Sequence, residues 1–230
     1  MSSLRNNLLL FFLALVIVSC ESPENETPTK VAYYGSEFYQ IEVGRSWTYK
    51  VDSSAFNKLS DSTVFDSYIQ RIRIGSIFFQ NETDTTYKLE VFTSHDTISR
   101  PLKLTHTYQL MVKPLKIILI EENFPLVKLI VPFFNNQQWE GNEFNNLVSQ
   151  KPYFRLRLND TKTQAVVTEQ ADSSCLGVSE VYSTYERNVG LSYFSRRFVE
   201  FVQDPLNPCA TPLVINNERR LSMQLLYTHK

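Results

Sequence analysis

The chain has 230 residues, with 23 basic and 24 acidic side chains and a formal net charge of −1. That balance argues against a nucleic-acid partner, which requires a strongly basic surface. The 16 Phe and 12 Tyr residues outnumber the 6 Gly, which favours aromatic-rich strands and leaves few glycines for phosphate-binding loops.

Residues 1–19 have the features of a lipoprotein signal peptide. Arg5 is followed by the apolar run "LLLFFLALVIV", which is too short to span a bilayer because a spanning helix needs about 20 apolar residues. A charged start and a short apolar core are typical of secretory signals. The stretch "IVSC", which ends at Cys20, resembles the bacterial lipobox. That resemblance implies cleavage before Cys20, acylation of its sulfur and a lipid anchor; the alternative is a secreted protein in which Cys20 is incidental.

Residues 20–32 are expected to form a lipidated, disordered tether. The stretch "ESPENETPTKVA" after Cys20 holds three Glu and two Pro and almost nothing apolar, so it cannot offset the entropy of ordering. Its acidic residues resemble the signals that export some Bacteroidetes-type lipoproteins to the cell surface, although a plain solvated linker explains the same composition. Removing residues 1–19 takes away only Arg5 among the charged residues, so 22 basic and 24 acidic side chains remain.

Residues 33–230 are predicted to form a single β-rich domain, because apolar and polar side chains alternate along most of it. Period-two alternation with one polar face is typical of half-buried antiparallel strands. Two stretches are more continuously apolar and could be covered on both faces. The alternating stretches include "SWTYKVD", "TYKLEVF", "LKLTHTYQLMV" and "YFRLRLND", and the continuous ones are "KIILIEE" and "PLVKLIVPFF".

One stretch departs from this alternation. Val178, Val181, Tyr182 and Tyr185 fall at helical spacing, which predicts a short helix over 178–186. We therefore expect a mainly β fold: a single antiparallel, meandering and strongly curved sheet of nine to eleven strands with one short helix. The sheet could be a barrel, a half-barrel or a sandwich.

Two cysteines remain in the domain, Cys175 and Cys209. Disulfides persist in the compartments that exported proteins enter, and two leftover cysteines make the smallest possible pair. The sequence predicts a Cys175–Cys209 disulfide, with two unpaired buried thiols as the alternative.

Motifs that would indicate catalysis or cofactor binding are missing from the sequence. His95, His106 and His229 are too scattered for a helical metal pair, and no H-E-x-x-H motif occurs. There is no G-x-S-x-G nucleophile elbow and no G-x-x-x-x-G-K-[ST] phosphate loop. We predict no catalytic residue, no metal site and no cofactor.

Three pieces together resemble a family of uncharacterised Bacteroidetes-type outer-membrane or surface lipoproteins. "VGRSWTYKVDS" is similar to a V-G-x-x-W-x-Y-x-V-D start, "WEGNEFNN" to a W-x-G-N-x-[YF]-N loop, and "EVYSTYERNVGLSYF" to an E-x-Y-x-x-x-x-G-[VI]-G-L-[VI]-Y segment. In the last piece Asn188 replaces a glycine of the family pattern, and Asn also tolerates positive φ. The resemblance implies an outer-membrane location and β structure, and it adds no chemistry.

Trp139 is the predicted candidate for ligand contact, because it lies in a turn-rich segment and loops carry function more often than core strands do. The alternative is that Trp139 packs beneath the turn at Gly141-Asn142.

Three functions compete on this evidence. The first is a non-catalytic envelope lipoprotein, held at the outer membrane through Cys20, whose β domain binds an envelope protein or a glycan. The second is a carrier of an apolar ligand in a half-barrel groove lined by residues such as Leu104, Tyr108 and Ile118. The third and least favoured is a hydrolase, which would require an unrecognised cluster of carboxylates or histidines.

Overall fold

The computed structural model describes residues 36–95, 101–145, 152–169, 172–204, 206, 209 and 213–229. They belong to one compact unit that covers residues 33–230. The predicted signal peptide, the tether and Cys20 lie outside the described residues.

The described residues form one antiparallel sheet, as the alternation predicts, and the expected β fold class is confirmed. The short 3₁₀ helix η1 (Ser36–Phe38) precedes the sheet. The strands are β1 (Ser46–Asn57), β2 (Ser62–Gln80), β3 (Thr85–Ser94), β4 (Lys103–Lys113), β5 (Lys116–Glu121), β6 (Phe124–Ile130), β7 (Gln138–Glu140), β8 (Tyr153–Leu158), β9 (Gln164–Glu169), β10 (Asp172–Ser173), β11 (Gly177–Glu186), β12 (Gly190–Phe201) and β13 (Ile215–His229).

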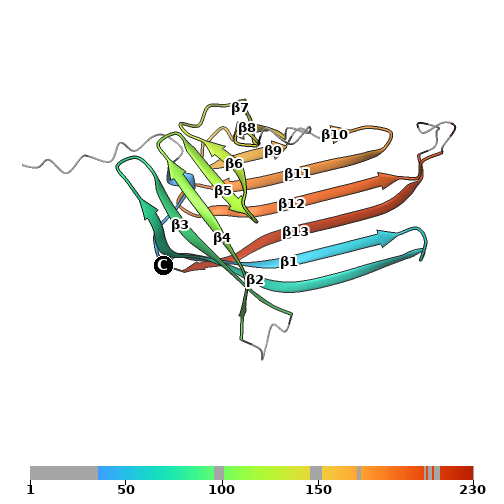
Figure 1. Ribbon diagram of the computed structural model, residues 1–230, viewed down its shortest axis with the longest axis horizontal. Helices are drawn as coiled ribbons and strands as arrows, with labels where there is room; N and C mark the ends of the chain where they lie inside the picture. Colours follow the sequence, from blue (N-terminus) through green and yellow to red (C-terminus); the bar gives the residue numbers. More distant parts are fainter. Residues whose placement is uncertain are drawn as a thin grey trace, which may run out of the picture. The chain divides into compact units, whose positions relative to one another are not determined.

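The sheet is a meander in which almost every strand pairs with its neighbours in sequence. The order is β6-β5-β4-β3-β2-β1-β13-β12-β11-β9-β8-β7, and β10 pairs only with β11. β1 and β13 pair along their whole length, from Ser46 opposite His229 to Asn57 opposite Asn217, so the first and last strands lie side by side at the middle of this order (Figure 1).

The two edge strands, β6 and β7, approach each other and nearly close the sheet into a barrel. The Val127 N–H donates to the Gly141 carbonyl at 2.9 Å. The Trp139 indole N–H donates in turn to the Val127 carbonyl at 3.0 Å. These bonds satisfy polar backbone groups of β6 that an open edge would leave to solvent.

The predicted helix over 178–186 is wrong, because β11 occupies these residues as a strand. β11 pairs with β12 on one side and with β9 on the other, so its backbone groups bond between strands. The helical spacing of Val178, Val181 and Tyr182 is coincidental, since Val, Thr and Tyr fit a pleated sheet well and tertiary pairing decides between the two patterns. Among the described residues the only helix is η1.

The core consists of two clusters of buried side chains. The first joins β5 and β6 to β8 and β9 and includes Phe38 of η1; its buried members are Phe38, Ile118, Val127, Leu129, Val131, Phe133, Trp139, Phe154, Leu156, Ala165 and Val167. The second lies on β1, β2 and β13, with Trp47, Tyr49, Val51, Ile74 and Met223 buried. We call the side of β1 and β11–β13 that carries Val51, Met223 and Phe194 the core face, and the opposite side the open face.

Two of the segments that resemble the lipoprotein family contact each other in space. Side chains at the start of β1 donate hydrogen bonds to carbonyl groups of the turn between β11 and β12. The Arg45 guanidinium donates to the Asn188 carbonyl at 3.0 Å. Trp47 Nε1 donates to the Val189 carbonyl at 2.6 Å, and the Tyr49 hydroxyl donates to the Leu191 carbonyl at 2.9 Å. These residues therefore hold β1 to a turn about 140 residues away, which is an architectural role.

Candidate functional site

A hollow on the open face is a candidate site, and its floor follows from strand register. Asp52 of β1 pairs with Ser222 of β13, Ser222 with Ser195 of β12, Ser195 with Tyr182 of β11, and Tyr182 with Thr168 of β9. Paired residues on adjacent strands point to the same face, so these five side chains form one row. Val51, Met223 and Phe194 precede or follow members of this row and point to the core face.

A second row runs parallel to the first, two residues further along each strand. It consists of Ser54, Arg220, Arg197 and Glu180 on β1, β13, β12 and β11. Tyr193 and Phe65 also line the hollow, whose volume is about 730 Å³. The hollow forms because the small side chains of Ser54, Ser195 and Ser222 lie between larger aromatic and charged side chains. We call this site the serine basin.

Arg197, Arg220 and Glu180 of the second row are held in ion pairs, two of which run to Glu218 of β13 beside the basin. The Arg197 Nε donates to Glu218 at 2.8 Å, and Arg197 lies 3.5 Å from Glu180. Arg220 contacts the same Glu218 at 2.8 Å. The hydrogen bond to Glu218 is the main cause that raises the pKa of Arg197. The guanidinium groups are therefore fixed in position, and the basin offers oriented donors rather than a free charge.

Two tyrosines form the aromatic part of the basin. The rings of Tyr182 and Tyr193 meet edge to face with centroids 6.0 Å apart. Tyr182 is 38% exposed, so part of its ring is available to a ligand. Sequence reasoning missed this pair because it assigned Tyr182 to a helix. Period-two alternation over Glu180, Tyr182 and Thr184 would have placed these three on one face.

A smaller hollow of about 500 Å³ lies at β4, β5 and β6. Its lining combines apolar and charged side chains: Tyr108, Leu119, Glu121, Glu122, Phe124, Leu126 and Lys128. Of the three residues predicted to line a carrier groove, only Tyr108 lies here. Leu104 is 53% exposed and does not line this hollow, while Ile118 is buried in the first core cluster. The hollow is therefore not the dry groove expected from the sequence.

The structure places the other predicted site residues as follows. Trp139 is buried in the first core cluster, stacks on Phe154 with centroids 5.6 Å apart and donates its indole N–H to Val127. This is the packing role that the sequence left as the alternative to ligand contact. Cys175 and Cys209 are joined by a disulfide. Cys20 lies outside the described residues.

Metal binding and membrane spanning are two further properties of the domain. The described residues contain no group of three or more His, Cys, Asp or Glu side chains that could hold a metal ion. No helix formed by these residues has the length and apolarity needed to cross a membrane.

Comparisons with protein-family models, with curated proteins and with solved structures found no match to the chain.

Proposed function

We propose that the protein is a non-catalytic envelope lipoprotein, anchored in the outer membrane through Cys20, and that its β domain binds a glycan in the serine basin. The anchor is supported by the lipobox-like "IVSC" and the short apolar run before it. The glycan is supported by the composition of the basin.

The observation that carries the proposal is the combination of partly exposed tyrosine rings with a row of hydroxyl groups and fixed ion pairs. A pyranose ring presents an apolar C–H face and a belt of hydroxyl groups that both donate and accept hydrogen bonds. The C–H face matches a ring such as Tyr182. The hydroxyl belt matches Ser195, Ser222 and the paired Arg197 and Glu180, which supply donors and acceptors together. The carrier hypothesis does not account for the row of hydroxyl groups or for the paired charges.

Glycan binding is tested with the mature chain carrying Cys20→Ser, which keeps it soluble, on an immobilised glycan array followed by calorimetry with the best ligand. Tyr182→Ala and Ser195→Leu are expected to weaken binding at least tenfold, because one removes the exposed ring and the other fills the floor. Tyr153→Ala is the matched control, since Tyr153 lies on β8 outside the basin and is 47% exposed. Failure of the unaltered basin to bind any glycan, or equal affinity of Tyr182→Ala and Tyr153→Ala, contradicts the proposal.

The anchor is tested separately by labelling cells with a radioactive fatty acid. The unaltered protein is expected to incorporate label and to sediment with outer membranes, whereas Cys20→Ala incorporates none. Equal labelling of the two proteins would refute acylation at Cys20 without bearing on the basin.

A further inference from the structure

The end of β2 carries three consecutive apolar side chains that are exposed. Ile77, Phe78 and Phe79 are 45%, 71% and 53% exposed, and every residue from 76 to 83 is exposed. Successive side chains of a strand point to opposite faces. The end of β2 is therefore bare on both faces, unlike β1, which buries one face in the core. Exposed apolar patches of this kind mark contact sites for proteins or membranes.

A second hairpin adds to this apolar end. Lys113 of β4 forms an ion pair with Asp84 of the β2–β3 turn at 3.2 Å, so the β4–β5 hairpin lies next to the β2–β3 hairpin. Leu115, in the turn of the β4–β5 hairpin, is 48% exposed. Two successive hairpins thus present apolar side chains at one place. We call Ile77, Phe78, Phe79 and Leu115 the apolar tip.

Four basic and four acidic side chains lie around the apolar tip, and seven of them are held in ion pairs. Their charges cancel, so this end of the molecule does not attract an anionic surface at long range. The favourable transfer of apolar side chains out of water therefore decides what this end contacts. The basic members are Arg73, Lys88, Lys113 and Lys116, and the acidic members are Asp84, Glu90, Glu143 and the exposed Glu82.

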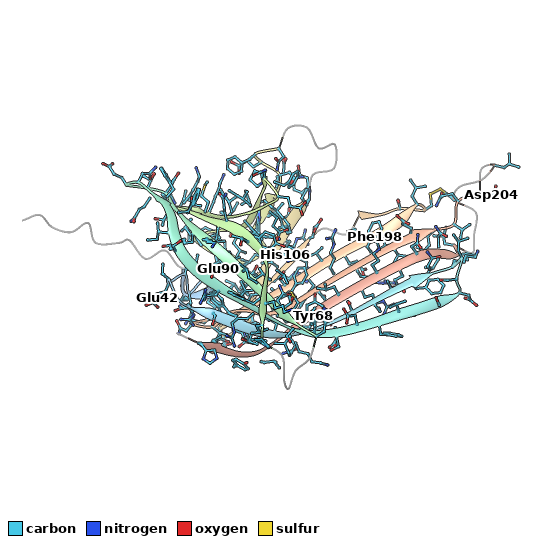
Figure 2. The ribbon with its side chains drawn as sticks, turned by 60° about the horizontal axis from the view of Figure 1, so that its bottom comes forward. Glu42, Tyr68, Glu90, His106, Phe198 and Asp204 are labelled. Carbon is cyan, nitrogen blue, oxygen red and sulfur yellow. A yellow bond between two sulfur atoms is a disulfide. The ribbon has the colours of Figure 1, made fainter. Side chains whose placement is uncertain are left out.

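The apolar tip lies at the end of the sheet where β1 begins. The Gly44 N–H donates to the Ile74 carbonyl at 2.8 Å, three residues before the apolar tip. Figure 1 shows β2 and β3 bending away at the left end of the sheet, where β1 starts. In Figure 2, Glu42, just before β1, and Asp204, just beyond β12, lie at opposite ends of the molecule. The described part of the chain therefore starts at the same end as the apolar tip.

The length of chain before η1 limits the distance between Cys20 and the domain. Residues 21–35 link Cys20 to Ser36, and a chain spans at most about 3.3–3.6 Å per residue, so the two residues are at most about 55 Å apart. β1 has 12 residues and runs about 40 Å at about 3.3 Å per residue. A bilayer that holds Cys20 is therefore within reach of the apolar tip, whereas contact at the far end of the sheet requires a nearly extended chain.

We propose that the apolar tip docks on the lipid bilayer that holds the anchor, with Phe78 and Phe79 inserted just below the head groups. The proposal rests on the anchor of the proposed function and is independent of glycan binding. A tip that is bare on both faces suits a bilayer, which surrounds an inserted side chain, better than a partner protein that covers one face. Because the charges around the tip cancel, the contact does not require anionic lipids.

The contact sets the orientation of the domain at the membrane. Asp52 and Ser54 of the serine basin lie in the second half of β1, on the part of the long strands that leads away from the apolar tip. Docking at the apolar tip therefore keeps the basin clear of the lipid surface and open to a ligand. A few inserted side chains suffice, because the anchor holds the tip at a high effective concentration next to the bilayer.

The test uses the mature chain coupled through Cys20 to a maleimide lipid in phosphatidylcholine vesicles. Coupling at Cys20 is selective because Cys175 and Cys209 are joined in a disulfide. The probe is Phe78→Trp, whose added fluorescence is expected to be mostly lost when the lipids carry bromine near the head-group end of their acyl chains. The background comes from Trp47 and Trp139, which are buried, and is measured with the unaltered protein.

Leu59→Trp is the matched control, because Leu59 is 94% exposed in the turn after β1, at the far end of the sheet. Its fluorescence is expected to be the same with brominated and ordinary lipids. Adding Phe79→Ser to Phe78→Trp is expected to reduce the quenching, whereas high salt leaves it unchanged. Circular dichroism confirms that each variant is folded.

The proposal is overturned if Phe78→Trp keeps its fluorescence on brominated vesicles, or if Phe78→Trp and Leu59→Trp are quenched alike. It is also overturned if, without vesicles, the emission of Phe78→Trp shifts to the blue as the protein concentration rises, which would assign the apolar tip to a second copy of the chain. Loss of quenching at high salt would refute an apolar contact. Because the anchor is supplied chemically, none of these outcomes depends on acylation of Cys20 in the cell, which the fatty-acid labelling tests.

Discussion

Gly190, the first residue of β12, is predicted to be the most sensitive glycine of the contact between β1 and the β11–β12 turn. Its φ of +102° lies in the region that side-chain-bearing residues rarely adopt. A Cβ placed on Gly190 would lie 3.0 Å from Trp47 Nε1, the atom that donates to the Val189 carbonyl. Gly190→Ala therefore combines backbone strain with displacement of a hydrogen-bonded indole.

The variant Gly44→Ala measures the cost of backbone strain without the displacement of Trp47. The φ of Gly44 is +93°, close to that of Gly190, but a Cβ there would meet nothing within 4 Å. Gly44→Ala is thus expected to cost only the backbone strain, about 1–2 kcal/mol. Gly190→Ala is expected to cost a further amount of about 1–3 kcal/mol, because Trp47 is only 8% exposed and a buried N–H that loses its acceptor pays its desolvation.

The assay is urea unfolding followed by circular dichroism, with stability compared from the midpoints at unchanged slope. The variant Trp47→Phe completes a double-mutant cycle. In that background Gly190→Ala should cost no more than Gly44→Ala, since the N–H that it displaces is gone. Equal destabilisation by Gly190→Ala and Gly44→Ala in the unaltered protein would refute the argument.

Two further predictions concern an ion pair and the disulfide. Arg73 donates to Glu90 at 2.9 Å, and this bond, followed by that of Lys88, lowers the pKa of Glu90. The ion pair therefore stabilises the fold fully at pH values above the pKa of Glu90 in the unfolded chain, about 4.3. This stabilisation is lost as the pH falls through the lowered pKa of Glu90 in the folded protein. Glu90→Gln should cost about 0.5–1 kcal/mol at pH 7 and nothing at pH 2 by urea unfolding; a cost that does not change with pH contradicts the assignment. The Cys175–Cys209 disulfide closes a separation of 34 residues, so replacing both cysteines by Ser should lower the unfolding free energy by about 3–4 kcal/mol, and a loss below about 1 kcal/mol would contradict the loop-entropy argument.

Most of the strands could be predicted from the sequence because alternation is a local signal. β1 and β8 show this alternation most clearly. Tyr49 and Val51 are buried on either side of the exposed Lys50, and Phe154 and Leu156 are buried on either side of the exposed Arg155. The helix predicted over 178–186 failed because helical and strand periods can coincide over nine residues, and pairing of β11 with two neighbours decided the outcome.

The serine basin could not be predicted, because it depends on register between strands that are far apart in sequence. Ser195 and Ser222 become neighbours only through the β12–β13 pairing, and Asp52 joins them through β13.

Strand length explains why part of the long strands lies outside the core. β1, β12 and β13 contain 12, 12 and 15 residues, whereas β5, β8 and β9 contain 6 each. At about 3.3 Å per residue, the long strands run roughly 20 Å or more beyond what the short ones can cover. Core packing therefore needs only part of the long strands. Arg196 and Arg197 are consecutive residues on β12 that point to opposite faces. Arg197 points into the serine basin, whereas Arg196 points to the core face and is exposed there, so this part of β12 is uncovered on both sides.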